Sequence, residues 1–152
     1  MNGDGFGLTQ LTDHGFFPAW SPDGTKIAFG SVRNSADGDL WVMNADGANA
    51  QLLLTLPGDD IDMSWAPSSK LVFSHHQDVK TGYDVYVFDP AAFTLMRVTT
   101  NAGGDFWPSW SPDAARVVYE ARGKGSTRIM SILPDGTDPV YVADGSDPSW
   151  GP

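Results

Sequence analysis

Apolar and polar residues alternate in short runs along the chain, and no segment repeats them with a convincing helical period. Runs such as KIAFGS (26–31), DLWVMN (39–44) and KLVFSH (70–75) have the period of two that is typical of a strand with one face on a core. Sequences rich in Pro, Asp and Gly separate the runs and favour tight turns. The pattern predicts an all-β protein of short antiparallel strands.

One segment recurs along the chain. FFPAWSPDGTKIAFG (16–30) returns as IDMSWAPSSKLVFS (61–74), as FWPSWSPDAARVVYE (106–120) and, shortened, as SDPSWGP (146–152). Its Trp residues stand at 20, 65, 110 and 150, with spacings of 45, 45 and 40 residues, and such a period is the length of one four-stranded propeller blade. We therefore predict a β-propeller of four-stranded blades, with about three blades in the chain.

The repeat alignment also predicts boundaries. Blade 1 is expected at 13–55, blade 2 at 56–100 and blade 3 at 101–143. Residues 1–12 match residues 43–55 and are expected to form the fourth strand of an incomplete blade, while residues 144–152 are expected to form the first strand of a further blade.

Three blades do not close a ring, since propellers have about four to eight blades. The two terminal blades would then expose apolar faces, which favour aggregation when left open. We expect a homo-oligomer, with two chains completing one ring. The alternatives are that the chain is a fragment of a longer product or a piece without an evolved function of its own.

The composition favours strands and turns and argues against nucleic acid and membranes as partners. The chain has 18 Asp but one Glu, and Asp prefers turns whereas Glu suits helices. A net charge of -10 with scattered Lys and Arg disfavours nucleic acid, and no apolar run reaches the roughly 20 residues needed for membrane insertion. The recurring hairpin turns hold five acids, which are predicted to be architectural: Asp4, Asp23, Asp46, Asp113 and Asp135.

A candidate binding surface comes from the position three residues before each repeated Trp. Phe17, Asp62, Trp107 and Asp147 occupy it. An odd separation from the core-facing Trp places them on the opposite face of a regular strand, and the first strand of a blade lines the central channel. We expect these residues, together with Asp60 and Asp105 at the channel mouth, to bind a partner or ligand. Simple lining of the channel is the alternative.

Metal and catalytic motifs are weak. Asp59, Asp60 and Asp62 could offer oxygen ligands to calcium, but their spacing does not match an EF-hand loop. His75 and His76 are neighbours on a strand and are expected in a solvated loop. With no Cys, no G-x-S-x-G motif and no phosphate-binding loop, the sequence predicts a protein that is not an enzyme and has no cofactor other than a possible calcium ion.

The repeats resemble those of the TolB family, whose pattern runs P-x-W-S-P-D-G, an apolar strand, S-x-R, D-[IL]-[YW]-V-M-[ND] and D-G. The first repeat matches it at Pro18, Trp20, Ser21, Pro22, Asp23, Gly24, Phe29, Ser31, Arg33, Asp39, Leu40, Trp41, Val42, Met43, Asn44, Asp46 and Gly47. The second repeat departs at its APSS turn, and the third has Arg128 in place of the third-strand acid. The resemblance implies a six-bladed propeller in complete members, and this chain resembles half of one plus flanking strands.

The resemblance also implies a role. In that family the propeller docks protein partners in the periplasm, including an outer-membrane lipoprotein of the peptidoglycan-associated type, although no signal peptide is recognisable in this chain. We therefore predict a non-enzymatic protein-interaction scaffold. Two alternatives stay open: the substrate-docking propeller of a prolyl-oligopeptidase-like or tricorn-like peptidase, and a propeller that binds a small ligand or sugar with calcium.

Overall fold

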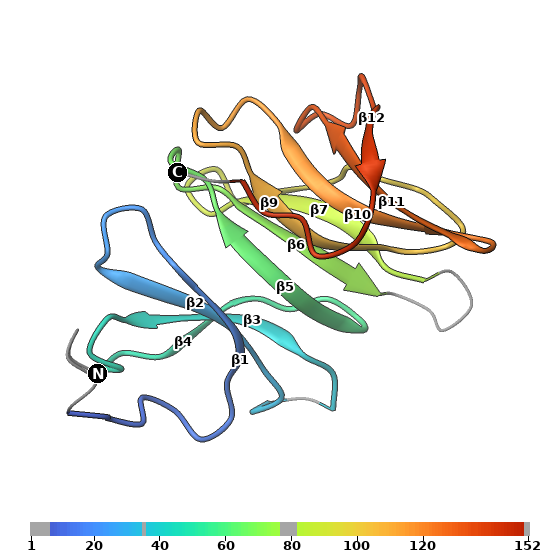
Figure 1. Cartoon of the computed structure of the whole chain (residues 1–152). Coiled ribbons are helices and arrows are strands. Elements are labelled where there is room, and N and C mark those ends of the chain that lie inside the picture. Colours follow the sequence, from blue (N-terminus) through green and yellow to red (C-terminus); the bar gives the residue numbers. More distant parts are fainter. Residues whose placement is uncertain (1–6, 35, 77–81, 151–152) are drawn as a thin grey trace.

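The computed structural model describes residues 7–34, 36–76 and 82–150, which form three four-stranded antiparallel sheets without a helix (Figure 1). Blade 1 consists of β1 (Phe16–Trp20), β2 (Lys26–Ser31), β3 (Asp39–Asn44) and β4 (Gln51–Leu54). Blade 2 consists of β5 (Asp59–Trp65), β6 (Leu71–His76), β7 (Asp84–Asp89) and β8 (Thr94–Arg97). Blade 3 consists of β9 (Asp105–Trp110), β10 (Val117–Gly123), β11 (Ser126–Ile132) and β12 (Val140–Asp144).

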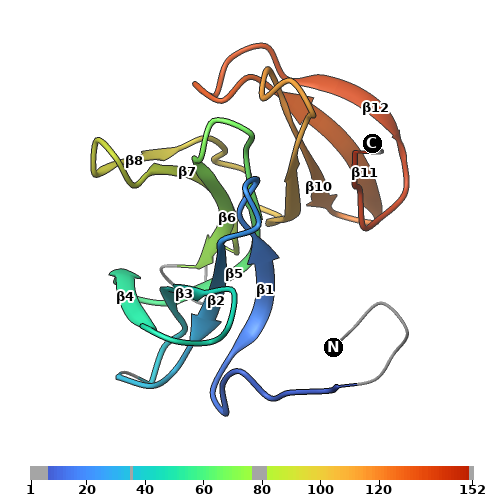
Figure 2. The ribbon, with the colours of Figure 1, turned by 90° about the vertical axis from the view of Figure 1, so that its left-hand side faces the viewer.

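The strands of each blade pair in sequence order, so every blade is a meander that runs from its first strand to its fourth. The first strands of successive blades contact one another, β1 with β5 and β5 with β9. Figures 1 and 2 show the three blades side by side, with blades 1 and 3 at the two ends of the row. This arrangement confirms the prediction of a propeller-type all-β fold and places the first strands innermost.

Acidic side chains hold the hairpin turns, as the sequence predicted. Asp23 Oδ1 accepts hydrogen bonds from Ser21 Oγ at 2.7 Å and from the main-chain N of Thr25 at 3.0 Å. Asp113 repeats the arrangement with Ser111, and the pKa of both carboxyls is lowered chiefly by the Ser hydroxyls. Asp46 and Asp135 each accept a bond from a main-chain N two residues ahead, whereas Asp4 lies outside the described residues.

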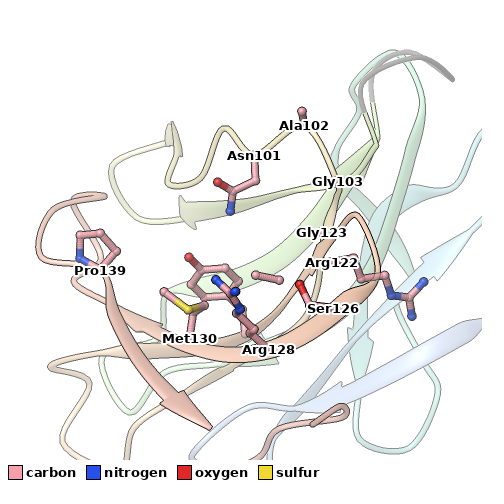
Figure 3. Close-up of a pocket in the computed structure, with 11 residues that line it drawn as sticks. Asn101, Ala102, Gly103, Arg122, Gly123, Ser126, Arg128, Met130 and Pro139 are labelled. Atoms are coloured by element: carbon pink, nitrogen blue, oxygen red, sulfur yellow. The ribbon is translucent and has the colours of Figure 1, made fainter. Parts of the chain in front are cut away.

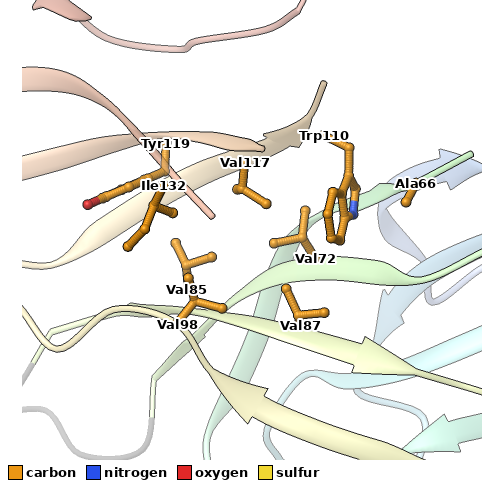
Figure 4. Packing of buried hydrophobic residues seen from close by; sticks show 9 residues of the cluster. All are labelled: Ala66, Val72, Val85, Val87, Val98, Trp110, Val117, Tyr119 and Ile132. Atoms are coloured by element: carbon orange, nitrogen blue, oxygen red, sulfur yellow. The ribbon is translucent and has the colours of Figure 1, made fainter. Parts of the chain in front are cut away.

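Apolar side chains fill the space between adjacent blades. Between blades 2 and 3, Val72, Val85 and Val87 face the aromatic pair Trp110 and Tyr119 (Figure 4). A second cluster joins blade 1 to blade 2 and centres on Phe73 and Phe88, both almost fully buried. Each such interface removes several large side chains from water, and this burial is the main stabilising contribution to the stack.

The repeated Trp residues differ in environment. Trp110 is only 6% exposed, and Trp65 is half-buried and donates a hydrogen bond of 3.1 Å from Nε1 to the main-chain O of Ala19 in blade 1. Trp20 is 58% exposed, because no blade among the described residues lies against its side of blade 1. Trp65 and Trp110 therefore pack between neighbouring blades, whereas Trp20 does not.

The flanking segments depart from the prediction. Residues 7–12 form no strand, and residues 145–150 form none either; residues 1–6 and 151–152 lie outside the described part of the chain. A strand needs a neighbour to pair with its main-chain groups, and none of the described sheets includes these segments. Leu11 packs instead on the apolar face of blade 1.

The described residues also include no helix of the length and apolarity needed to cross a membrane.

Candidate functional site

The first strand of each blade is interrupted at the same place. The pairing with the second strand shifts after Phe16, after Ile61 and after Phe106, as in a β-bulge. The next residues have left-handed backbone, with φ of 49° at Phe17, 55° at Asp62 and 47° at Trp107. Asp147, the fourth equivalent residue, has a φ of 51°. The expected regular alternation is therefore wrong for these positions, because a bulge re-aims the side chains of the strand that contains it.

The bulges bring three of the predicted residues together. Phe17, Asp62 and Trp107 line one groove of about 300 Å³ that crosses the inner strands of all three blades. The other lining residues are mostly small or proline: Pro18, Met63, Ser64, Pro108, Ser109 and Pro148. Phe17 is 44% exposed and Trp107 is half-buried, so two aromatic side chains are accessible in this groove.

Asp62 is the charged group of the groove, and it is only 8% exposed. Its Oδ2 accepts a long hydrogen bond of 3.5 Å from the main-chain N of Trp107, while Oδ1 is buried and has no hydrogen-bond partner among the described residues. The pKa of Asp62 is raised to about 6, chiefly by burial and also by the charge of Asp147, while the hydrogen bond from Trp107 and the charge of Arg122 act against the rise. The Asp62 carboxylate is therefore shielded from water and has few hydrogen bonds to replace it.

Arg122 lies beside the aromatic wall. Its guanidinium is 4.2 Å from the ring centre of Phe106 and 5.0 Å from that of Trp107. Its Nε donates a 2.6 Å hydrogen bond to Glu120 Oε1, and this Glu side chain is 1% exposed. Arg122 is thus already engaged by Glu120 and the two rings. This position was not identified from sequence, since a single Arg at the end of a strand carries no distinctive signal.

Asp60 and Asp105 do not lie at an open channel mouth, which corrects the sequence prediction. Both are 0% exposed. Asp60 Oδ1 lies 2.8 Å from His75 Nδ1, and the Asp60 main-chain N donates to Gly38 O in blade 1. Asp105 accepts two bonds from Asn101 Nδ2, and its main-chain N donates to Tyr83 O in blade 2. Burial raises the pKa of each to about 6. Their contacts tie each first strand to the preceding blade.

His75 differs from the prediction as well. It is 4% exposed inside β6 rather than solvated in a loop, and its ring packs edge-on against Tyr86. Asp147 is exposed, and its main-chain N donates to Glu120 Oε2 at 3.2 Å. Sequence alternation could not reveal the Asp60–His75 pair, because the two residues belong to different strands and meet only through their register.

The calcium candidates make three different sets of contacts. Asp59 accepts from the main-chain N of Gly38, Asp60 pairs with His75, and Asp62 lies in the groove. Within residues 7–34, 36–76 and 82–150, no three His, Asp or Glu side chains are grouped to hold a metal ion. The carboxylates therefore do not form one ligand set. Asp59 and Asp60 are successive strand residues that point to opposite sides, and the bulge after Ile61 re-aims the side chain of Asp62.

A second cavity, of about 430 Å³, lies between the Asn101–Gly103 connection and strands β10 and β11. Figure 3 shows Arg128 and Met130 on one side and Asn101 on the other, while the Arg122 guanidinium points away. Arg128 occupies the position of Asp39 and Asp84 in the other blades, so the charge is reversed at this site. In the sequence, this change from Asp to Arg was the feature that could have pointed to the cavity.

Comparisons with known proteins agree on one family. The TolB beta propeller domain model matches residues 7–152. A TolB homolog from Chlorobium luteolum is 29% identical over 137 residues, which cover 88% of this chain and 30% of that protein. The Tol-Pal system protein TolB of Anaeromyxobacter dehalogenans is 46% identical over 50 residues, or 33% of this chain and 11% of that protein.

Solved structures show the same fold. The crystal structure of TolB from Acinetobacter baumannii superposes with a TM-score of 0.72 at 18% identity, covering 88% of this chain and 34% of the other. The chain thus spans about a third of the length of these TolB proteins or less. With the repeated motif, the four-stranded blades and the family match over residues 7–152, the chain belongs to the TolB β-propeller domain family.

Proposed function

We propose that this chain is a non-enzymatic protein-interaction scaffold and that its partner docks on the inner groove. The observation that carries the proposal is the pair of accessible aromatic side chains, Phe17 and Trp107, on either side of a buried carboxylate, Asp62. Aromatic residues are enriched at protein interfaces, and Trp is enriched among the few residues that dominate the binding energy. The groove is formed by the first strands of three blades, so it exists in the chain without a partner.

The relatives support a protein as the partner. One of them is named as a component of the Tol-Pal system, which is an assembly of proteins. The lipoprotein of the peptidoglycan-associated type is therefore the first partner to test.

The test measures binding of a purified lipoprotein domain of that type to the chain by calorimetry. Phe17→Asn and Trp107→Asn remove the rings, and Asn tolerates the left-handed backbone at both sites. Each is expected to weaken binding at least about tenfold. Phe93→Asn is the matched control, because Phe93 has a φ of 51° and is 70% exposed in the outer β7–β8 turn. Unchanged binding in both groove variants would place the partner elsewhere. Absence of binding, where a full-length TolB binds in the same assay, would refute the scaffold role.

We also propose that a second copy of the chain covers the open face of blade 1. This face has an apolar cavity of about 300 Å³ that includes Leu11, Trp20, Ile27, Phe29 and Met43. The equivalent face of blade 3 is filled by Val72, Val85 and Val87 of blade 2, so the surface that fits it is another blade. Blade 3 of a second copy is the occupant proposed, since blades 1 and 3 stand at opposite ends of the row (Figure 1).

Sedimentation velocity tests this association. The wild-type chain is expected to sediment as a dimer at micromolar concentrations, and Trp20→Lys is expected to sediment as a monomer because it places a charge on the apolar face. Phe93→Lys, at an exposed residue outside the face, should leave the dimer intact. A wild-type chain that is monomeric at all concentrations would contradict the proposal.

A further inference from the structure

We propose that the groove formed by Phe17, Asp62 and Trp107 binds a cationic side chain of the partner, a Lys ammonium or an Arg guanidinium. This inference rests on the proposed function, because it names the chemistry of the group that the docking partner presents. The partner's cation would donate the hydrogen bond that Asp62 Oδ1 lacks and would lie against the rings of Phe17 and Trp107.

The first support is the state of the Asp62 carboxylate. The side chain is more than nine-tenths buried, its Oδ1 lacks a partner within the described part of the chain, and its Oδ2 has a single long contact with the main-chain N of Trp107. A buried carboxylate without hydrogen bonds is unfavourable. A cation in the groove would supply both the charge and the donors that this group lacks.

The second support is the balance of charge around the groove. Asp62, Asp147 and Glu120 all contribute negative charge there, and Arg122 contributes the positive charge. The guanidinium of Arg122 is held by Glu120 at 2.6 Å, so it does not neutralise Asp62 by contact. The remaining field is negative, and it favours a cation over a neutral or anionic group.

The third support is the aromatic lining. Phe17 and Trp107 line the same groove as Asp62, and their rings offer the negative face that attracts ammonium and guanidinium groups. Arg122 already shows this affinity, since its guanidinium lies 5.0 Å from the Trp107 ring centre. Three of the six other lining residues are prolines, which have no main-chain N–H to donate to the Asp62 carboxylate.

The experiment uses small probes on the intact chain. The Trp107 indole signal is followed by ¹H–¹⁵N NMR, and its assignment comes from the Trp107→Asn variant. The probes are Nα-acetyl-lysine methylamide and Nα-acetyl-arginine methylamide, with Nα-acetyl-norleucine methylamide as the uncharged match for lysine. We expect a saturable shift with at least one cationic probe and binding at least tenfold weaker with norleucine.

Asp62→Asn is the decisive variant. Asn keeps the shape and accepts a φ of 55°, so the fold is preserved while the charge is lost. We expect cation binding to fall at least tenfold. Asp46→Asn makes the same change of net charge in an exposed turn and should alter binding less than twofold. Equal binding of norleucine, undiminished binding by Asp62→Asn, or no saturable shift with either cation overturns the inference.

The two proposals fail in different ways. Cation binding that depends on Asp62, with no binding of a lipoprotein domain that a full-length TolB binds, would leave the cation site standing and refute the scaffold role. Partner binding that depends on Phe17 and Trp107 but is unchanged in Asp62→Asn would leave the scaffold standing and overturn the cation site.

Discussion

His75 Nδ1 lies 2.8 Å from Asp60 Oδ1 inside blade 2, with the two side chains 4% and 0% exposed. The pair joins the first strand of the blade to the second, at a residue whose main-chain N also donates to Gly38 O of blade 1. Asp60 therefore contacts the second strand of its own blade through its side chain and blade 1 through its main-chain N.

We predict that His75→Ala lowers the free energy of unfolding by about 3 kcal/mol at neutral pH, because it leaves the buried Asp60 carboxyl without its partner. Urea denaturation measures the change. The same substitution in an Asp60→Asn background should cost less, since the amide in that background carries no buried charge. Equal costs in the two backgrounds would show that the pair has no coupling.

The repeated Trp residues should rank by burial. Trp110→Ala is expected to destabilise the chain by about 3–5 kcal/mol, because it empties the interface between blades 2 and 3. Trp65→Ala should cost less, and Trp20→Ala less than about 1 kcal/mol in the monomer, since Trp20 is 58% exposed. Denaturant unfolding, at protein concentrations too low for association, measures the loss of unfolding free energy in each variant. A large loss for Trp20→Ala would contradict the predicted order.

Stability should depend on pH through Asp62. Its pKa rises from 3.8 to about 6 on folding, so the native state binds the proton more tightly than the unfolded state. This contribution is fully present below about pH 4 and is lost as the pH rises through about 6. Asp62→Asn should therefore raise the free energy of unfolding at pH 7.5, by up to about 3 kcal/mol, and change it little at pH 4. Urea titrations at both pH values measure this difference, and an equal effect at the two would refute it.

The left-handed backbone at Phe17 predicts an unusual order of substitutions. Phe17→Gly is expected to be more stable than Phe17→Ala by about 1 kcal/mol, because Gly has no Cβ to strain at a φ of 49°. Leu95, at an exposed position of strand β8, should show the usual order, with Ala more stable than Gly. Thermal unfolding of the four variants compares the two sites, and the same order at both would contradict the bulge.

Much of the fold follows from local chemistry. The alternation of apolar residues specifies strands, the Asp-containing turns join them, and the 45-residue Trp spacing gives the size of a blade. The acids at Asp23, Asp46, Asp113 and Asp135 form the predicted turn contacts because their partners are only two residues away.

The site depended on contacts between segments distant in sequence. Phe17, Asp62 and Trp107 meet in one groove because three bulges align across three blades, and regular alternation gives no account of the bulges. Asp60 and Asp105 have the sequence surroundings of exposed acids, yet the preceding blade buries both. The sequence by itself determined the strands, the turns and the repeat, since these depend on neighbours along the chain. Only the packing of one blade on the next decided which carboxylates are buried and which line the groove.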